Sequence, residues 1–195
     1  MNIHTIILAA GEGSRMKSKR AKSLQRVGGK TMLEMICKTA ESISAKITLI
    51  VGFDKNSIIN ESKSFDFEIS TCEQASPIGT GDAVKCGINE VDDADKVLVL
   101  YGDVPLIKKE TLENLVSKDD KSLTILSTKV DNPFGYGRVK KDNDGNVTQI
   151  IEEKDASNAD KKISEIFTGI LCCNKVLLAE ALEEIKNDNA AGEYY

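Results

Sequence analysis

The chain has 195 residues, of which 41% are hydrophobic and 29% are charged. This length and composition predict one globular domain with a sizeable core and argue against a disordered chain. The formal net charge of −5 argues against a general nucleic-acid-binding protein, which normally carries a basic surplus. No apolar run approaches the ~18 residues of a membrane span, and the N-terminus lacks the basic start of a signal peptide.

Residues that build metal sites and hydrolytic triads are scarce. The five cysteines form no C-x-x-C pair, and this pattern predicts reduced, mostly buried thiols in a cytoplasmic protein. The single histidine, His4, starts an apolar run, which predicts a structural role. A zinc site and a Ser-His-Asp triad are therefore strongly disfavoured.

Apolar runs alternate along the chain with segments of helical periodicity. Strands are expected at residues 4–10, 46–52, 65–71, 96–105, 122–130 and 165–174, and helices at 31–43, 54–62, 79–91, 109–118 and 175–187. Asp54 is expected to cap the second helix. This alternation predicts a doubly wound α/β fold whose mostly parallel sheet is covered on both faces.

One later segment has a different pattern. Between residues 135 and 155, two alternating stretches flank Asn143-Asp144-Gly145, a turn sequence typical of a β-hairpin. We expect this hairpin to extend the same sheet or to cover a site.

The first strand leads into a basic segment with small residues, LAAGEGSRMKSKRAK (residues 8–22). A dinucleotide fingerprint fails because Met16 occupies the third glycine position, and a P-loop fails because Leu24 stands where its first glycine is required. The small residues would still let a base or a polyphosphate approach the backbone, and Arg15 and Lys22 could bind phosphate oxygens. A solvated glycine turn is the alternative.

Three further segments carry chemical signals. A buried strand ends in Tyr101-Gly102-Asp103, where a carboxylate is well placed for Mg²⁺ and substrate phosphates; a turn aspartate that caps the next helix is the alternative. Gln74 offers an amide for the edge of a base. Glu152 could accept hydrogen bonds from sugar hydroxyls, or could belong to a solvated charge run.

Taken together and in this order, the motifs resemble those of one enzyme family. The chain resembles the pyrophosphorylase domain of bacterial N-acetylglucosamine-1-phosphate uridylyltransferases, which are sugar nucleotidyltransferases. The matching segments are LAAGEGSRM with Lys22, QASPIGTG, YGDVPL, GYGR, EEKDA, TGIL and NDNAAGEYY. The resemblance covers essentially the whole chain.

The resemblance implies a Rossmann-like fold of the nucleotide-diphospho-sugar transferase type, with residues 1–195 forming one domain that is truncated at its C-terminus. It also implies Mg²⁺-dependent, in-line uridylyl transfer from UTP to N-acetylglucosamine 1-phosphate, without a covalent intermediate. The product, UDP-N-acetylglucosamine, would serve cell-wall biogenesis. No nucleic-acid or membrane partner is implied, and an oligomer is expected only where the family's C-terminal β-helix is present.

Each motif carries expected site residues by the same resemblance. Catalysis is assigned to Arg15 and Lys22, and the metal ligand is Asp103. The expected nucleotide-binding residues are Leu8, Ala9, Ala10, Gly11, Gly13, Gln74, Gly79 and Thr80. The expected sugar-binding residues are Tyr101, Gly102, Gly137, Glu152 and Thr168.

Three features depart from the family pattern. Phe167 stands where the family usually has a sugar-binding asparagine, and the loss of such a hydrogen bond costs about 1–3 kcal/mol. Ala21 replaces a proline before Lys22, which would loosen the loop. A second metal-binding asparagine of the family would lie beyond Tyr195. A catalytically impaired UTP-binding relative, or a transferase for another sugar phosphate or nucleotide, is therefore the alternative. Glu12 has no assigned role.

Overall fold

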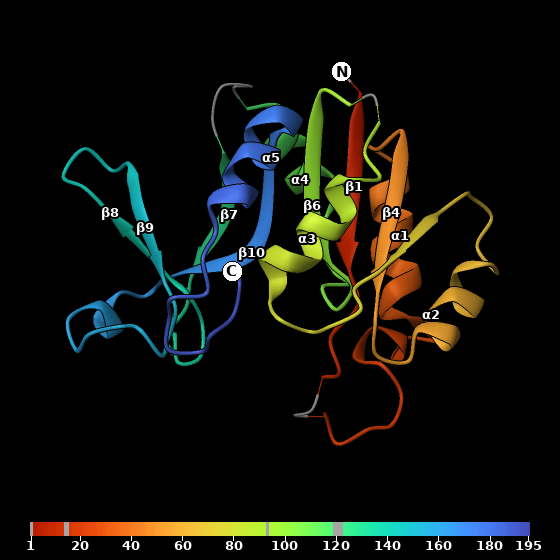
Figure 1. Cartoon of the computed structure of the whole chain (residues 1–195), viewed down its shortest axis with the longest axis horizontal. Helices are drawn as coiled ribbons and strands as arrows, with labels where there is room; N and C mark the ends of the chain where they lie inside the picture. Colours follow the sequence, from red (N-terminus) through yellow and green to blue (C-terminus); the bar gives the residue numbers. More distant parts are fainter. Residues whose placement is uncertain (1, 14–15, 93, 119–122) are drawn as a thin grey trace.

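The computed structural model describes residues 2–13, 16–92, 94–118 and 123–195 (Figure 1). Its strands are β1 (Ile3–Leu8), β2 (Arg26–Val27), β3 (Lys30–Thr31), β4 (Lys46–Val51), β5 (Ser70–Glu73), β6 (Lys96–Tyr101), β7 (Thr124–Lys129), β8 (Arg138–Lys141), β9 (Val147–Ile151) and β10 (Glu165–Asn174). Its α-helices are α1 (Met32–Glu41), α2 (Lys55–Ser62), α3 (Thr80–Ile88), α4 (Lys109–Val116) and α5 (Lys175–Glu184). Two short 3-10 helices are η2 (Lys22–Leu24) and η3 (Asp160–Lys162).

The main sheet has the strand order β5-β4-β1-β6-β10-β8-β9, with β7 also paired to β10. Strands β5, β4, β1 and β6 are parallel to one another, which confirms the predicted doubly wound α/β fold. Strand β10 joins antiparallel to β6, and β7 and β8 join antiparallel to β10. The carboxyl ends of β1, β4 and β6 therefore lie along one edge of the sheet.

Apolar side chains cover both faces of the parallel strands. On β1, Ile7 lies in the core that α1, α2 and α4 cover, and its neighbour Ile6 lies in the core under α3 and α5. This alternation explains why the central strands read as continuous Val/Ile/Leu runs. His4 is buried on β1, where its Nε2 lies 2.8 Å from the Thr48 hydroxyl, and burial lowers its pKa.

The predicted hairpin extends the main sheet. Strands β8 and β9 pair antiparallel, and Arg138 at the start of β8 pairs with Ile166 of β10. The Asp142 carboxylate accepts hydrogen bonds from the N–H groups of Asp144 and Asn146, which closes the turn. The hairpin projects beyond the edge of the helix-covered sheet (Figure 1).

Two expectations about local structure were wrong. Asp54 precedes α2 but makes no side-chain cap, because it adopts a left-handed conformation (φ 55°) and accepts the N–H of Ala21 at 3.1 Å instead. The strand expected at 65–71 begins only at Ser70, because Phe65 and Phe67 stack on each other and pack against the core. No helix in the described part of the chain combines the length and apolar character that a membrane span needs.

Candidate active site

A cleft of about 290 Å³ opens where β1 and β6 end. It gathers predicted residues from three separate segments of the chain. These residues are Leu8, Ala9, Ala10, Gly11, Gly13, Lys22, Gln74, Gly79, Thr80, Tyr101 and Asp103. Arg15 lies outside the described residues.

The turn Gly52–Phe53–Asp54, which follows β4, binds both ends of the basic loop. The N–H of Phe53 donates to the carbonyl of Ala10 at 3.0 Å, where the loop begins. The Asp54 carboxylate accepts the N–H of Ala21 at 3.1 Å, where the loop ends. Ala21 is fully buried, so this hydrogen bond fixes the backbone just before Lys22. Ala21, in place of the family's proline, was expected to loosen the loop, and this hydrogen bond opposes that loosening.

Lys22 and Asp103 form an ion pair in the cleft. The Lys22 ammonium lies 2.5 Å from Asp103 Oδ2, and the two side chains are 40% and 27% exposed. Gly13 packs against this lysine, since a Cβ at Gly13 would lie 2.9 Å from Lys22 Cβ, and its φ of +64° favours glycine. The structure thus pairs the expected phosphate-binding cation with the expected metal ligand.

Gln74 follows β5 and is 7% exposed. Its Nε2 donates to the carbonyl of Gly79 at 3.0 Å and to Asp82 Oδ2 at 2.8 Å. Both amide hydrogens are therefore used within the protein. Gln74 lines the cleft, and the part of its amide that these two hydrogen bonds leave is Oε1, a hydrogen-bond acceptor.

The C-terminal segment closes over the loop that precedes α3. The carbonyl of Tyr194 accepts the N–H of Gly81 at 2.8 Å, and the N–H of Tyr194 donates to the carbonyl of Ile78 at 2.9 Å. Gly79 has a φ of +137°, and a Cβ there would lie 2.2 Å from the Tyr194 carbonyl oxygen. Glycine is therefore required where the tail crosses this loop.

Tyr101 lines the cleft, whereas Gly102, which follows it, is not among the residues that line the cleft. Burial raises the pKa of Tyr101, a hydrogen bond with Thr80 acts in the opposite direction, and the charges of Glu152 and Asp103 raise it further. Gly102 is buried, and a Cβ there would lie 3.3 Å from Ala9 Cβ.

Gly137 and Glu152 lie against each other at the base of the hairpin. A Cβ at Gly137 would lie 2.8 Å from Glu152 Oε1, so a larger residue there would require the Glu152 side chain to move. Burial, followed by the charge of Asp155, raises the pKa of Glu152.

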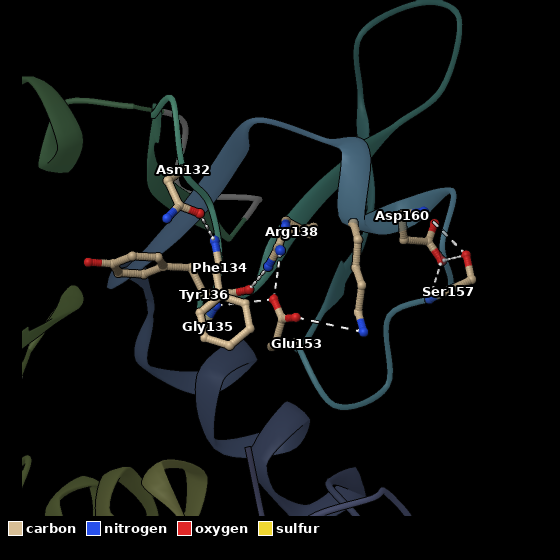
Figure 2. A network of polar contacts seen from close by, with 9 residues as sticks. Asn132, Phe134, Gly135, Tyr136, Arg138, Glu153, Ser157 and Asp160 are labelled. Atoms are coloured by element: carbon tan, nitrogen blue, oxygen red, sulfur yellow. Dashed lines mark hydrogen bonds and ion pairs between the residues drawn. The ribbon is translucent and has the colours of Figure 1, made fainter. Parts of the chain in front are cut away.

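An ion pair between the buried Arg138 and the partly exposed Glu153 holds the loop that ends at Gly137 (Figure 2). Arg138 is 1% exposed, and its Nη2 donates to Glu153 Oε2 at 2.6 Å while its Nη1 donates to the carbonyl of Tyr136. Glu153 Oε2 also accepts the N–H of Gly135 at 3.1 Å. The Arg138 bond and this backbone bond lower the pKa of Glu153, so the glutamate next to Glu152 stays ionised.

Strand β10 carries Thr168, which was predicted to bind sugar, and Phe167, which departs from the family pattern. The hydroxyl of Thr168 donates to the carbonyl of Leu126 at 2.8 Å, within an irregular stretch of the β7–β10 pairing. Phe167 is half-buried, and its N–H donates to the carbonyl of Gly137 at 2.8 Å. Thr168 does not line the cleft among the described residues, and its expected sugar contact remains a prediction.

Four residues of the cleft were not predicted: Ser23, Pro77, Ala83 and Glu193. Ser23 has a buried hydroxyl without a hydrogen-bond partner among the described residues. Glu193 belongs to a C-terminal motif of the resemblance, but only long-range folding places it beside the cleft, where its charge raises the pKa of Glu152. Neither residue carries a local sequence signal for ligand binding.

Two solved structures of other proteins share the fold of this chain. HddC from Yersinia pseudotuberculosis aligns with a TM-score of 0.68 and 23% identity, over 91% of this chain and 79% of that chain. The 4-diphosphocytidyl-2C-methyl-D-erythritol synthase from Anaerococcus prevotii aligns with a TM-score of 0.66 and 19% identity, over 94% and 74%. At these identities the likeness supports the fold alone.

Curated relatives named Bifunctional protein GlmU match the chain along its length. The protein from Psychrobacter sp. (strain PRwf-1) is 43% identical over 98% of this chain and 42% of its own length. The protein from Alcanivorax borkumensis is 43% identical over 100% of this chain and 43% of its own length. The chain thus spans less than half the length of these relatives. The family model described as the MobA-like NTP transferase domain matches residues 5–191, and the chain belongs to this family of nucleotidyltransferases.

Proposed function

We propose that this domain transfers the uridylyl group of UTP to N-acetylglucosamine 1-phosphate, giving UDP-N-acetylglucosamine and pyrophosphate. The observation that carries the proposal is the ion pair between Lys22 and Asp103 in a cleft at the carboxyl ends of the strands. A cation and a carboxylate at this edge of an α/β sheet suit a triphosphate and its metal ion. The relatives named GlmU support a sugar nucleotide as product.

The base would bind against the small residues of the first loop. Ala9 and Ala10 leave room for a flat ring, and Gly11 has no atom within 4 Å of the place a Cβ would take. The Oε1 of Gln74 would accept the N3–H of uracil, because both hydrogens of its amide are already used.

The triphosphate would separate the ion pair that the cleft contains. Lys22 would move from Asp103 to the phosphate oxygens, where an ammonium stabilises the charge that develops on the leaving pyrophosphate. The sugar phosphate oxygen would attack the α-phosphorus in line, and catalysis would come mainly from positioning and charge neutralisation.

The cleft fits Mg²⁺ bound through one carboxylate. Among the described residues there is no group of three or more His, Cys, Asp or Glu side chains that could hold a metal, so a site with only protein ligands does not fit. Mg²⁺ commonly binds through one or two carboxylates, substrate phosphates and water. Asp103 would hold such an ion, which supplies charge neutralisation at the phosphates when bound.

The sugar would lie towards Tyr101, Gly137 and Glu152. Glu152 is a half-buried carboxylate that is influenced by the charges of Asp155, Arg138 and Glu193, and it would accept hydrogen bonds from neutral sugar hydroxyls more readily than it would bind a second phosphate. Transfer to a different sugar 1-phosphate is the second candidate. It is favoured by Phe167, which lies next to Gly137 without a polar side-chain group.

The test is release of pyrophosphate with UTP and Mg²⁺ in the presence of N-acetylglucosamine 1-phosphate, glucose 1-phosphate or galactose 1-phosphate. We expect turnover to be fastest with the acetamido sugar and to stop when EDTA removes the metal. Faster turnover with another sugar would select the second candidate. Binding of UTP without turnover on any sugar would contradict both and indicate a relative that only binds the nucleotide.

A further inference from the structure

We infer that Asp82 determines which base the cleft accepts, by fixing the orientation of the Gln74 amide. Asp82 is not among the residues that line the cleft, and instead lines a separate cavity of about 280 Å³ beside α3 and α5. It is thus a positioning residue that acts through Gln74. The inference rests on the proposed function of the cleft as a nucleotide site.

The first step is the geometry around the amide nitrogen. Nε2 of Gln74 lies 2.8 Å from Asp82 Oδ2 and 3.0 Å from the carbonyl oxygen of Gly79. Both neighbours are acceptors, and a carboxylate cannot donate. Rotation of the amide by half a turn would place Oε1 against two negative oxygens. The amide therefore has one favourable orientation.

The second step is the relative strength of the two contacts. A hydrogen bond to an ionised carboxylate is roughly twice as strong as one between neutral groups. The bond to Asp82 therefore contributes more to the orientation than the bond to the Gly79 carbonyl does. Asp82 lies in the first turn of α3, where the helix dipole also favours its negative charge.

The third step is what this orientation offers a ligand. With Nε2 held by the protein, Gln74 offers the cleft an acceptor. Uracil presents a donor at N3, whereas cytosine presents an acceptor there, which would face Oε1 and be repelled. A fixed acceptor thus favours UTP over CTP. An amide free to rotate would bind either base, because it could present its oxygen to one and its nitrogen to the other.

The test compares UTP and CTP binding, with Mg²⁺, to the full chain by calorimetry. The variants are Asp82→Ala, which removes the carboxylate, and Asp82→Asn, which can accept or donate. The matched control is Lys85→Met, because Lys85 lies on the same helix and lines the same cavity but pairs with Glu183 at 2.8 Å. Thermal melting is measured for each protein.

We expect the original chain to prefer UTP, and Asp82→Ala to reduce this preference about tenfold by weakening UTP and strengthening CTP. Asp82→Asn should reduce it less, and Lys85→Met should leave it unchanged. An unchanged preference in both Asp82 variants would overturn the inference, as would equal losses of affinity for both nucleotides. An original chain that binds neither nucleotide would instead contradict the proposed function itself.

Discussion

The regions proposed to bind the nucleotide and the sugar, called the nucleotide side and the sugar side, are built in different ways. On the nucleotide side, Leu8–Gly11, Gln74 and Tyr101 come at or directly after the ends of parallel strands, so the sheet itself places them. On the sugar side, Gly137 directly precedes β8 and Glu152 directly follows β9, so both lie at the base of the antiparallel hairpin and neither is among the residues that line the cleft. The ion pair between Arg138 and Glu153 holds that region, and so does the C-terminal segment, since Ala190 and Tyr195 both donate to the Asp155 carboxylate.

This difference predicts how the two sides respond to mutation. Backbone placed by a central parallel sheet keeps its position when one polar side chain is lost. Loops placed by a few charged side chains do not, because those contacts are the ones that fix them. Substitutions on the nucleotide side should therefore change chemistry at nearly constant stability, and substitutions on the sugar side should change both.

The largest expected effect is that of Lys22→Met. Removal of one charge that stabilises a transition state lowers turnover by roughly 100- to 1,000-fold. The melting temperature should hardly change, because the Lys22–Asp103 pair is 40% and 27% exposed. Pyrophosphate release and thermal melting check this.

The control for this prediction is Lys30→Met, which breaks a comparable exposed pair with Glu34 at 2.7 Å, away from the cleft. It should leave turnover intact. A loss of melting temperature in the Lys22 variant that matches its loss of activity would assign Lys22 a structural role.

Arg138→Met should have the next largest effect, and it should affect the sugar side more than the nucleotide side. The change leaves the Tyr136 carbonyl without its donor and removes the ion pair of Glu153, so that the N–H of Gly135 becomes the remaining hydrogen bond of Glu153 to this loop (Figure 2). We expect the melting temperature to fall by several degrees and the KM for the sugar phosphate to rise more than the KM for UTP.

The matched control is Lys161→Met, which removes the more exposed partner of Glu153 at 3.7 Å. Its effect on both quantities should be small. Equal increases of the two KM values in Arg138→Met would mean that the hairpin does not act on the sugar side selectively.

The same difference explains what the sequence predicted. Strand ends follow from apolar runs, so the positions of Gln74 and Asp103 in one cleft could be expected from the order of strands in a parallel sheet. The contact of Arg138 with Glu153 and the position of Glu193 depend on folding between distant segments. Asp54 was predicted to cap a helix because its local pattern is that of a cap, yet a buried N–H more than thirty residues earlier in the chain binds it instead.

Asp54→Gly should have a smaller effect, confined to the nucleotide side. Glycine suits the left-handed conformation of residue 54, so the fold should keep its stability while the hydrogen bond to Ala21 is lost. We expect a several-fold higher KM for UTP, because the backbone before Lys22 is held less firmly. Steady-state kinetics with UTP as the varied substrate check this.

A second substitution can test that explanation. Ala21 has a φ of −51°, which proline can adopt, so Ala21→Pro should stiffen the same backbone without the hydrogen bond. In the Asp54→Gly background, Ala21→Pro should return the KM for UTP to that of the original chain. Asp54→Asn alone should leave the KM for UTP close to that of the original chain, because asparagine can still accept the N–H of Ala21. A raised KM for UTP in both of these variants would show that Asp54 does not position Lys22.

The smallest expected effect is a change in melting temperature that has opposite signs at two adjacent glutamates, Glu152 and Glu153. Burial raises the pKa of Glu152 above its ordinary 4.5, so the stability tied to its protonated form is present below that value and is lost as the pH rises through the raised pKa. Glu152→Gln should thus melt slightly higher than the original chain at neutral pH, with the difference vanishing in acid.

The bond to Arg138 lowers the pKa of Glu153, so Glu153→Gln should melt lower at neutral pH, and this loss should also shrink in acid. Melting curves across this pH range check both signs, and a lower melting temperature for Glu152→Gln at neutral pH would contradict the prediction. Opposite signs at neighbouring positions would mean that Glu153 holds the sugar side together, whereas Glu152 lowers stability there and is retained for binding.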